Sequence, residues 1–230
     1  MNFKPKTMNK SAFFLSLLLS IFFLNDILGQ KKRSNNKALV QQESPITSDL
    51  FNGLEFRNIG PAFMSGRIAD LAIHPENDNI RYVAVASGGV WKTSNAGVTW
   101  EPIFDNEGSY SIGSLAIDPN NPHVVWVGTG ENDGGRHIGF GDGIYKTEDG
   151  GKTWTNMGLK ESEHLGTIYV HPENSDVVYV AAQGPLWSKG GQRGFYKTTD
   201  GGQTWKRTLG DNEWTGVAEF AVDPRNANRL

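Results

Sequence analysis

The stretch Lys146-Thr-Glu-Asp-Gly-Gly-Lys-Thr-Trp154 decides the fold of this chain. It recurs as Lys197-Thr-Thr-Asp-Gly-Gly-Gln-Thr-Trp205 and, less faithfully, as Lys92-Thr-Ser-Asn-Ala-Gly-Val-Thr-Trp100. The three tryptophans lie 54 and 51 positions apart. A period of about fifty residues indicates one structural unit that is used repeatedly.

Each copy of this stretch is predicted to form a hairpin turn. Asp-Gly and Asn-Ala-Gly supply the positive φ angles that a tight turn needs. The Asp side chain can accept hydrogen bonds from backbone N–H groups of its own turn. The Trp covers the turn with a large apolar ring. The pattern matches Ser/Thr-x-Asp-x-Gly-x-Thr-Trp, which is called the Asp-box.

A repeated aspartate can serve catalysis, metal binding or the turn itself. Every unit carries its own copy, whereas an active site needs only one, so we interpret the Asp-boxes as turn-stabilising elements. Their structural positions are Asn95, Gly97 and Trp100, then Asp149, Gly151 and Trp154, then Asp200, Gly202 and Trp205.

The chain from residue 50 onward is predicted to be strand and turn throughout. Four antiparallel strands in a unit of about fifty residues are typical of a β-propeller blade. The predicted fold class is therefore all-β: an incomplete propeller of four-stranded antiparallel blades with Asp-box turns. The blades are predicted at about 66–104, 112–157 and 165–208, with a truncated fourth at 215–230 whose first strand covers 217–222. Because propellers close with four to eight blades, further blades are expected C-terminal to this chain.

The first 49 residues are predicted to lie outside the propeller. Three lysines among the first ten residues precede a largely apolar run at 12–24, and Gly29 stands before an expected cut at Gln30. This order indicates a secretory signal peptide at 1–29, followed by a flexible polar leader at 30–49. We expect an extracytoplasmic protein with no membrane span after cleavage. A retained anchor is the alternative, although the apolar run is short for a span.

Composition excludes several classes of function. The formal net charge is −3 and the charged residues are scattered, which does not indicate a nucleic-acid surface. The chain contains no cysteine, so disulfides and Cys-based metal sites are impossible. We expect no metal and no cofactor.

Each first strand ends in a His-Pro or Asp-Pro pair. His74 and His171 occupy positions that Asp118 and Asp223 occupy in the other units. The exchange of His for Asp indicates capping of a turn rather than metal binding.

Function is expected where the blades differ. Loops after the second strand and links between blades share one face of a propeller, and these segments are irregular here. The loop at 130–142 is rich in charge, and aromatic residues in such loops suit stacking on sugar rings or peptide side chains. A solvated polar loop above packed aromatics is the alternative. The predicted ligand-binding residues are Arg67, Tyr110, Glu131, Asp133, Arg136, His137, Trp187, Arg193 and Trp214.

The Asp-boxes, together with strands such as Tyr-Val-Ala-Val at 82–85 and Val-Trp-Lys-Thr at 90–93, carry a family resemblance. Over about residues 55–230 the chain resembles the Asp-box propellers of the sortilin-like and xyloglucanase-like superfamily, in its exported bacterial form. The Asp-box is specific for this type of propeller. It says little about activity, because sialidases, sortilin-type receptors and xyloglucanases all carry it.

The resemblance implies a catalytic base that this chain lacks. Related xyloglucan hydrolases have an Asp two positions before a Gly-Gly pair that follows the second strand of the first blade. The matching stretch, Val85-Ala-Ser-Gly-Gly89, places Ala86 there. Inverting hydrolysis needs a carboxylate at this point to activate water, opposite a protonated acid. That acid would lie in a second propeller.

We therefore expect a secreted, sortilin-like binding module rather than an enzyme. Its partner would be a polysaccharide or a protein on the variable-loop face. The alternative is a xyloglucanase-like glycoside hydrolase that acts on xyloglucan or a related β-glucan. Under that alternative, Glu131 or Asp133 would replace the missing base.

Overall fold

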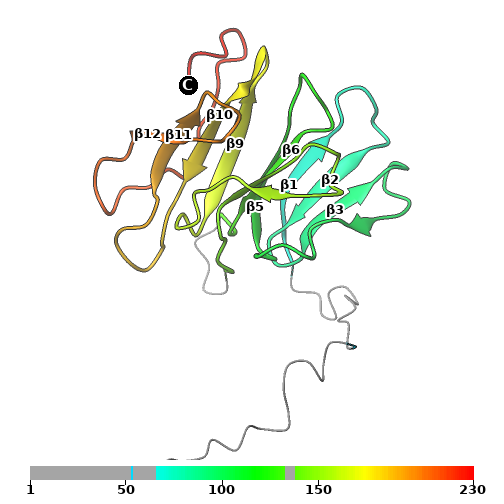
Figure 1. Ribbon diagram of the computed structural model, residues 1–230, viewed down its shortest axis with the longest axis horizontal. Helices are drawn as coiled ribbons and strands as arrows, with labels where there is room; N and C mark the ends of the chain where they lie inside the picture. The colour runs from blue at the N-terminus through cyan, green and yellow to red at the C-terminus, as the bar shows by residue number, and fades with distance from the viewer. Residues whose placement is uncertain (1–52, 54–65, 133–137) are drawn as a thin grey trace, which may run out of the picture. The chain divides into compact units, whose positions relative to one another are not determined.

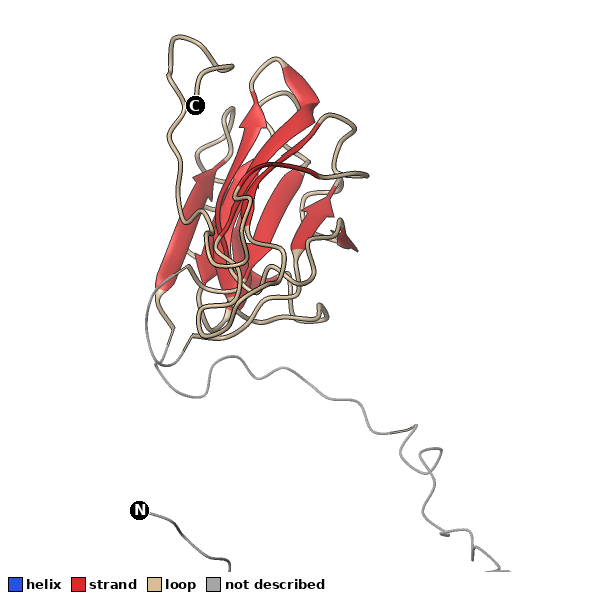
Figure 2. Ribbon diagram, turned by 90° about the vertical axis from the view of Figure 1, so that its left-hand side faces the viewer, coloured by secondary structure: helices blue, strands red, loops and turns tan. Residues whose placement is uncertain are grey.

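The structure is a computed structural model that describes residues 53, 66–132 and 138–230. These residues contain strands and loops but no helix (Figure 2). Apart from Gly53, they belong to one unit, Phe56–Leu230. The predicted signal peptide and leader lie outside the described residues, so both stay predictions.

The described residues form three antiparallel sheets of four strands each, which follow one another along the chain (Figure 1). In every sheet, strands that are consecutive in sequence are neighbours in space. This confirms the predicted all-β class and the four-stranded antiparallel blade. The first sheet contains β1 (Ile68–Ile73), β2 (Arg81–Val85), β3 (Gly89–Thr93) and β4 (Glu101–Pro102); the second contains β5 (Ile112–Ile117), β6 (Val125–Thr129), β7 (Ile144–Thr147) and β8 (Thr155–Asn156); the third contains β9 (Leu165–His171), β10 (Asn174–Ala182), β11 (Gly194–Thr198) and β12 (Lys206–Leu209).

The two hydrophobic cores of the described residues lie between neighbouring sheets. One joins Tyr82 and Phe104 of the first sheet to Leu115 of the second. The other joins Trp126 of the second sheet to Ile168 of the third. Burying each of these side chains stabilises the fold by about 1.5–3 kcal/mol. The sheets therefore hold together face to face, while their strand ends stay available for loops.

The Asp-box tryptophans connect each sheet to the one before it. The Trp154 indole N–H donates to the carbonyl of Ile103 over 2.7 Å. The Trp205 indole N–H donates to the carbonyl of Met157 over 2.8 Å. The box Trp therefore stabilises the contact between sheets as well as its own turn.

The Asp-box carboxylates close their own turns, as predicted. In the second sheet, Asp149 Oδ1 accepts the N–H groups of Lys152 and Thr153, at 2.9 and 3.0 Å. The Thr153 and Thr147 hydroxyls also donate to this carboxylate. These hydrogen bonds hold the pKa of Asp149 well below its usual range, and the bond from the Thr153 hydroxyl has the largest effect. Glycines at the next two positions take φ angles of 72° and 94°.

The proline turns after the first strands are capped in the same way in all units. The side chain of each His or Asp accepts the backbone N–H of the residue two positions later. The pairs are His74 with Glu76, Asp118 with Asn120, His171 with Glu173 and Asp223 with Arg225. The predicted turn-capping role of these four residues is confirmed.

Two strand predictions were wrong. The fourth strand was expected to start at the box Trp, but it begins one residue later, at Glu101, Thr155 and Lys206. In each box the side-chain oxygen of Asn95, Asp149 or Asp200 still accepts the N–H of the residue before the Trp. Residues 217–222 form no strand. A strand needs a neighbour that takes up its N–H and C=O groups, and the sequence given contains no second strand for this unit. Val217 instead donates one backbone bond to Ala182.

Candidate functional site

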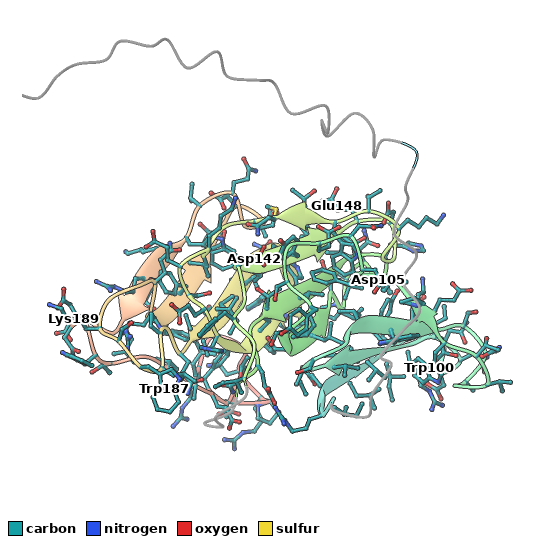
Figure 3. The ribbon with its side chains drawn as sticks, turned by 90° about the horizontal axis from the view of Figure 1, so that it is seen from below. Trp100, Asp105, Asp142, Glu148, Trp187 and Lys189 are labelled. Carbon is teal, nitrogen blue, oxygen red and sulfur yellow. The ribbon has the colours of Figure 1, made fainter. Side chains whose placement is uncertain are left out.

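The loops that follow the second strands meet the links between sheets at one end of the molecule (Figure 3). In all three sheets, the residue just before the first strand accepts a backbone hydrogen bond from the residue just after the second strand. The bonds join Ala86 N to Arg67 O at 2.9 Å, Gly130 N to Ser111 O at 2.7 Å and Gln183 N to His164 O at 2.9 Å. Arg67, Ser111 and His164 therefore hold equivalent places in their sheets.

These three equivalent residues converge on Glu131. Arg67 donates two hydrogen bonds, from Nε and Nη2, to the Glu131 carboxylate. The Ser111 hydroxyl accepts the Glu131 N–H at 3.0 Å. His164 Nδ1 lies 2.9 Å from the Glu131 carbonyl. Glu131 is only 3% exposed. Arg67 holds its carboxylate, while Ser111 and His164 hold its backbone.

The tautomer of His164 follows from its partner. A carbonyl only accepts hydrogen bonds, so Nδ1 carries the proton that is shared with Glu131. Burial lowers the pKa of His164, which keeps the ring neutral at pH 7. The ring also contacts Phe140, with 5.7 Å between ring centroids. His164 therefore positions Glu131 as a neutral donor, without adding charge.

A cleft of about 260 Å³ opens beside this carboxylate. It lies at the beginning of the three first strands, and Asn132 closes one side by donating to the Ala218 carbonyl at 3.2 Å. Its charged groups are one guanidinium and two carboxylates, which favours neutral or cationic ligands over anions. The lining residues are Arg67, Ile68, Ala69, Gly113, Glu131, Asn132, Gly166 and Glu219.

A second acidic group lies at the link between the first two sheets. The Tyr145 hydroxyl donates to Asp142 Oδ2 over 2.5 Å. Burial, followed by the charge of Asp142, raises the pKa of Glu107. Figure 3 labels Asp142. Glu107 was not among the predicted site residues, although both acids stand in segments that the sequence marked as irregular.

Two exposed tryptophans lie on loops that are tied to each other. Trp187 and Trp214 are 71% and 68% exposed. The first loop donates Gly190 N–H to the carbonyl of Glu213 at 2.8 Å, and Lys189 forms an ion pair with the Glu213 carboxylate at 3.1 Å. Both tryptophans therefore project from one connected segment of surface, at whose edge Figure 3 labels Trp187 and Lys189.

Arg193 lies inside the protein, which the sequence did not predict. Its side chain is 4% exposed, and its guanidinium donates to backbone carbonyls of both tryptophan loops. These acceptors are Pro185 at 2.9 Å, Ser188 at 2.7 Å, Gly190 at 2.8 Å and Trp214 at 3.0 Å. Four of the five N–H groups of an arginine are thereby used inside the protein. The geometry assigns Arg193 to holding the loops rather than to contacting a ligand.

The remaining predicted residues fall into two groups. Tyr110 is 65% exposed and its carbonyl accepts the N–H of Gly89 at 2.9 Å. Asp133, Arg136 and His137 lie outside the described residues. Ala86, which was predicted at the place of the catalytic base, is fully buried beside the Arg67 backbone.

Neither a metal site nor a membrane span is found in the described part of the chain. Across residues 66–132 and 138–230, no three His, Cys, Asp or Glu side chains come together in a way that could hold a metal ion. No helix of the described residues has the length and apolar character to cross a membrane.

Comparisons with known proteins agree with this architecture. A family model described as "Sortilin, neurotensin receptor 3" matches residues 142–230. The chain is similar to a xyloglucanase of Hypocrea jecorina, with 25% identity over 187 residues that cover 75% of this chain and 21% of that protein. It is also similar to a xyloglucanase of Acetivibrio thermocellus, with 29% identity over 167 residues that cover 64% of this chain and 18% of that protein. The chain thus spans about a fifth of the length of these relatives.

Among solved structures, the chain is similar to an ancestral GH74 enzyme, with 22% identity and a TM-score of 0.50. The match covers 64% of this chain and 20% of that one. At this identity the likeness concerns the fold alone. Three four-stranded sheets, each with its Asp-box, define an incomplete Asp-box β-propeller. The sortilin-type match over residues 142–230 and the xyloglucanase relatives support a likeness to the sortilin-like and xyloglucanase-like superfamily.

Proposed function

We propose that this propeller binds a neutral β-glucan of the xyloglucan type on its loop face and does not hydrolyse it. The observation that carries the proposal is the pair of exposed tryptophans, Trp187 and Trp214, on loops tied through Arg193. The curated relatives named above are xyloglucanases, which suggests the class of glycan. The predicted export of the chain would bring it to extracellular polysaccharide.

The physical case rests on how indole rings meet sugars. A tryptophan offers a rigid apolar face with few rotatable bonds and a polar N–H at its edge. Pyranose rings offer C–H groups on one face and hydroxyls around the rim, so the two surfaces are complementary. Because the loops that carry Trp187 and Trp214 are already held by Arg193, little ordering free energy is lost on binding. A long, uncharged chain suits two such rings better than a small anion does.

The case against hydrolysis rests on Ala86. An inverting glycosidase needs a carboxylate that activates water on the face of the sugar opposite to the acid. Ala86 supplies no such group, and its methyl is buried. Glu131 is paired with Arg67, so its carboxylate is already engaged inside the protein.

One observation favours a second candidate, a glycoside hydrolase with a relocated base. Glu131 reaches Arg67, whose carbonyl accepts the Ala86 N–H. A carboxylate from the second sheet therefore stands beside the place where related hydrolases have theirs. Glu107, with a pKa raised by burial and by Asp142, is a possible acid on the same face. Loss of turnover on Glu131→Gln would be the signature of this candidate.

The experiment measures both activities on the same preparations. Xyloglucan binding is followed by affinity electrophoresis or calorimetry for the parent protein, Trp187→Ala and Trp214→Ala. Each substitution should weaken binding by about 2 kcal/mol, roughly thirtyfold, as for an aromatic contact at a hot spot. Leu209→Ala is the matched control, because Leu209 is an exposed apolar residue on β12 outside the two loops. It should bind like the parent.

Reducing-end release from xyloglucan is assayed in parallel, and none is expected. Turnover that Glu131→Gln abolishes would replace the proposal with the hydrolase. Xyloglucan binding that neither tryptophan variant weakens would show that the ligand uses another surface. A complete lack of glycan binding would leave the protein-ligand alternative.

A further inference from the structure

The cleft beside Glu131 is formed at the same position of the three first strands. Near the beginning of each strand the pairing register shifts, which leaves one residue without a partner on the second strand. These residues are Ala69, Gly113 and Gly166, and all three line the cleft of about 260 Å³. Bulges of this kind bend a strand and redirect its side chains, and they are frequent beside active sites. The cleft therefore follows from a feature that the three sheets share.

The two glycines of the cleft lie too close to neighbouring backbone to carry a side chain. A Cβ on Gly113 would lie 2.2 Å from the carbonyl oxygen of Leu165, and one on Gly166 would lie 1.9 Å from the carbonyl oxygen of Ala218. Both distances are far shorter than a van der Waals contact of about 3.5–4.0 Å. Recognition in this cleft therefore falls to its polar side chains, which are Arg67, Glu131, Asn132 and Glu219.

Asn132 offers the cleft a hydrogen-bond acceptor. Its Nδ2 donates to the Ala218 carbonyl at 3.2 Å. Because a carbonyl only accepts hydrogen bonds, this contact fixes which branch of the amide carries the nitrogen. The other branch, Oδ1, accepts no hydrogen bond from the residues that the structure describes. Asn132 can therefore accept a hydrogen bond from a ligand while it keeps its own bond to the backbone.

The two carboxylates of the cleft offer further acceptors. Arg67 donates two hydrogen bonds to Glu131, and an ionised carboxylate has about four acceptor sites, so part of its capacity remains. Glu219 is exposed, and within the described part of the chain its carboxylate has no hydrogen bond and no ion pair. Arg67 and Asn132 are the lining side chains that can donate, and both already donate to protein oxygens. The cleft is therefore richer in available acceptors than in available donors.

We propose that this cleft binds a primary ammonium group. An ammonium has three donors and no acceptor, which complements the Glu219 carboxylate, Asn132 Oδ1 and the remaining acceptor sites of Glu131. Arg67 offsets the charge of Glu131, so the carboxylate of Glu219 supplies the charge that attracts a cation. An anion would meet two carboxylates, and a hydroxyl group has one donor for several acceptors. The proposal is independent of glycan binding, because neither tryptophan of the proposed glycan site lines the cleft.

The test measures binding of small ammonium probes to the full-length protein by calorimetry, at low ionic strength because salt screens an exposed charge. Nα-acetyl-lysine methylamide presents the ammonium of a lysine side chain, and glycylglycine amide presents that of a chain terminus. Nα,Nε-diacetyl-lysine methylamide has the shape of the first probe without its charge. We expect saturable binding of at least one ammonium probe and none of the diacetylated compound.

Glu219→Gln keeps the size of the side chain and removes its charge. It should weaken probe binding at least about tenfold, since a hydrogen bond to a charged group contributes about 1.5–3 kcal/mol. Glu173→Gln is the matched control, because Glu173 is an exposed acid in the turn after β9 and does not line the cleft. It should bind the probes like the parent protein. Both positions are exposed, so neither variant should change the melting temperature.

Each outcome bears on the proposal. Binding that Glu219→Gln weakens and Glu173→Gln leaves unchanged supports it, and the probe that binds more tightly identifies the source of the ammonium. Equal binding of the diacetylated compound would overturn it, because the charge would then not be recognised. Binding that Glu219→Gln leaves unchanged, or no saturable binding of either ammonium probe, would also overturn it. Glycan binding is measured separately, so failure here leaves the proposed function standing.

Discussion

Replacing Arg193 with lysine should loosen the two tryptophan loops without unfolding the sheets. The guanidinium donates to four carbonyls at 2.7–3.0 Å, and a hydrogen bond from a charged donor contributes about 1.5–3 kcal/mol. A single ammonium cannot reach four separated carbonyls. Since such losses are not additive, we expect local opening to become easier by about 3 kcal/mol, the equivalent of about two bonds. Arg193 lies outside both hydrophobic cores, so the global melting temperature should change little.

Hydrogen exchange with mass spectrometry measures this opening directly. The N–H groups of Gly190 and Gln192 are bonded to Glu213 and Glu161 across the loops. Their exchange should accelerate about a hundredfold in Arg193→Lys, because 3 kcal/mol of easier opening corresponds to that factor. Arg207→Lys, on the exposed edge strand β12, is the control and should exchange like the parent. Unchanged protection at both amides in Arg193→Lys would refute the conclusion that this guanidinium holds the loops.

Four further outcomes are expected. Ala96 has a φ of 59° at a position where the other two boxes have glycine. Ala96→Gly should raise the free energy of unfolding of the protein by about 0.5–1 kcal/mol, because strain in the left-handed region is relieved. An unchanged denaturation midpoint would contradict this. Hydrogen bonds lower the pKa of Asp200 to about 2, and the bond from the Thr198 side chain has the largest effect. The usual pKa of an aspartate is about 3.9. Its ionised carboxylate therefore stabilises the fold above about pH 4, and this stabilisation is lost as the pH falls toward 2. In Asp200→Asn, the free energy of unfolding should fall less steeply between pH 4 and pH 2 than in the parent protein. The same pH dependence in both proteins would count against this role. Trp154→Phe removes the 2.7 Å hydrogen bond between sheets and should lower the free energy of unfolding by about 1–2 kcal/mol. Chemical denaturation measures this change, and an unchanged free energy of unfolding would show that the bond is unimportant. N-terminal mass spectrometry of exported protein should find Gln30 or a residue within a few positions of it, and an intact Met1 would exclude cleavage.

The sheets were predictable because their determinants are local. A turn such as Asp149-Gly-Gly closes with its own hydrogen bonds, so the nine-residue stretch specifies the same hairpin wherever it occurs. The 217–222 segment was mispredicted for the opposite reason. Its sequence favours a strand, but a strand exists only with a neighbour, and the prediction considered the residues of the segment without asking which described residues would pair with them.

Two residues that line the cleft were named from the sequence, but their geometry was not predicted. Arg67 and Glu131 were both named, yet nothing local showed that they meet across 64 positions of sequence. Alignment of the repeats would have placed Arg67, Ser111 and His164 at one position, which is the signal that could have revealed their convergence. Arg193 was named as a ligand contact because it stands in a loop on the variable face. Only the path of the backbone around it brings four carbonyls within reach.

The two ends of the strands carry different features, one structural and one variable, which explains how one fold can support different chemistry. One end of the sheets carries the Asp-boxes and the indole bonds that join neighbours, and changes there would loosen the whole assembly. The other end carries Ala86, Glu131 and the tryptophan loops, outside most of the apolar contacts between sheets. An alanine at position 86 leaves the backbone bond to Arg67 intact, because that bond uses only the N–H of residue 86. Exchange of a carboxylate for a methyl at this position therefore keeps the backbone link in place, so the fold itself does not decide which of the two residues stands there.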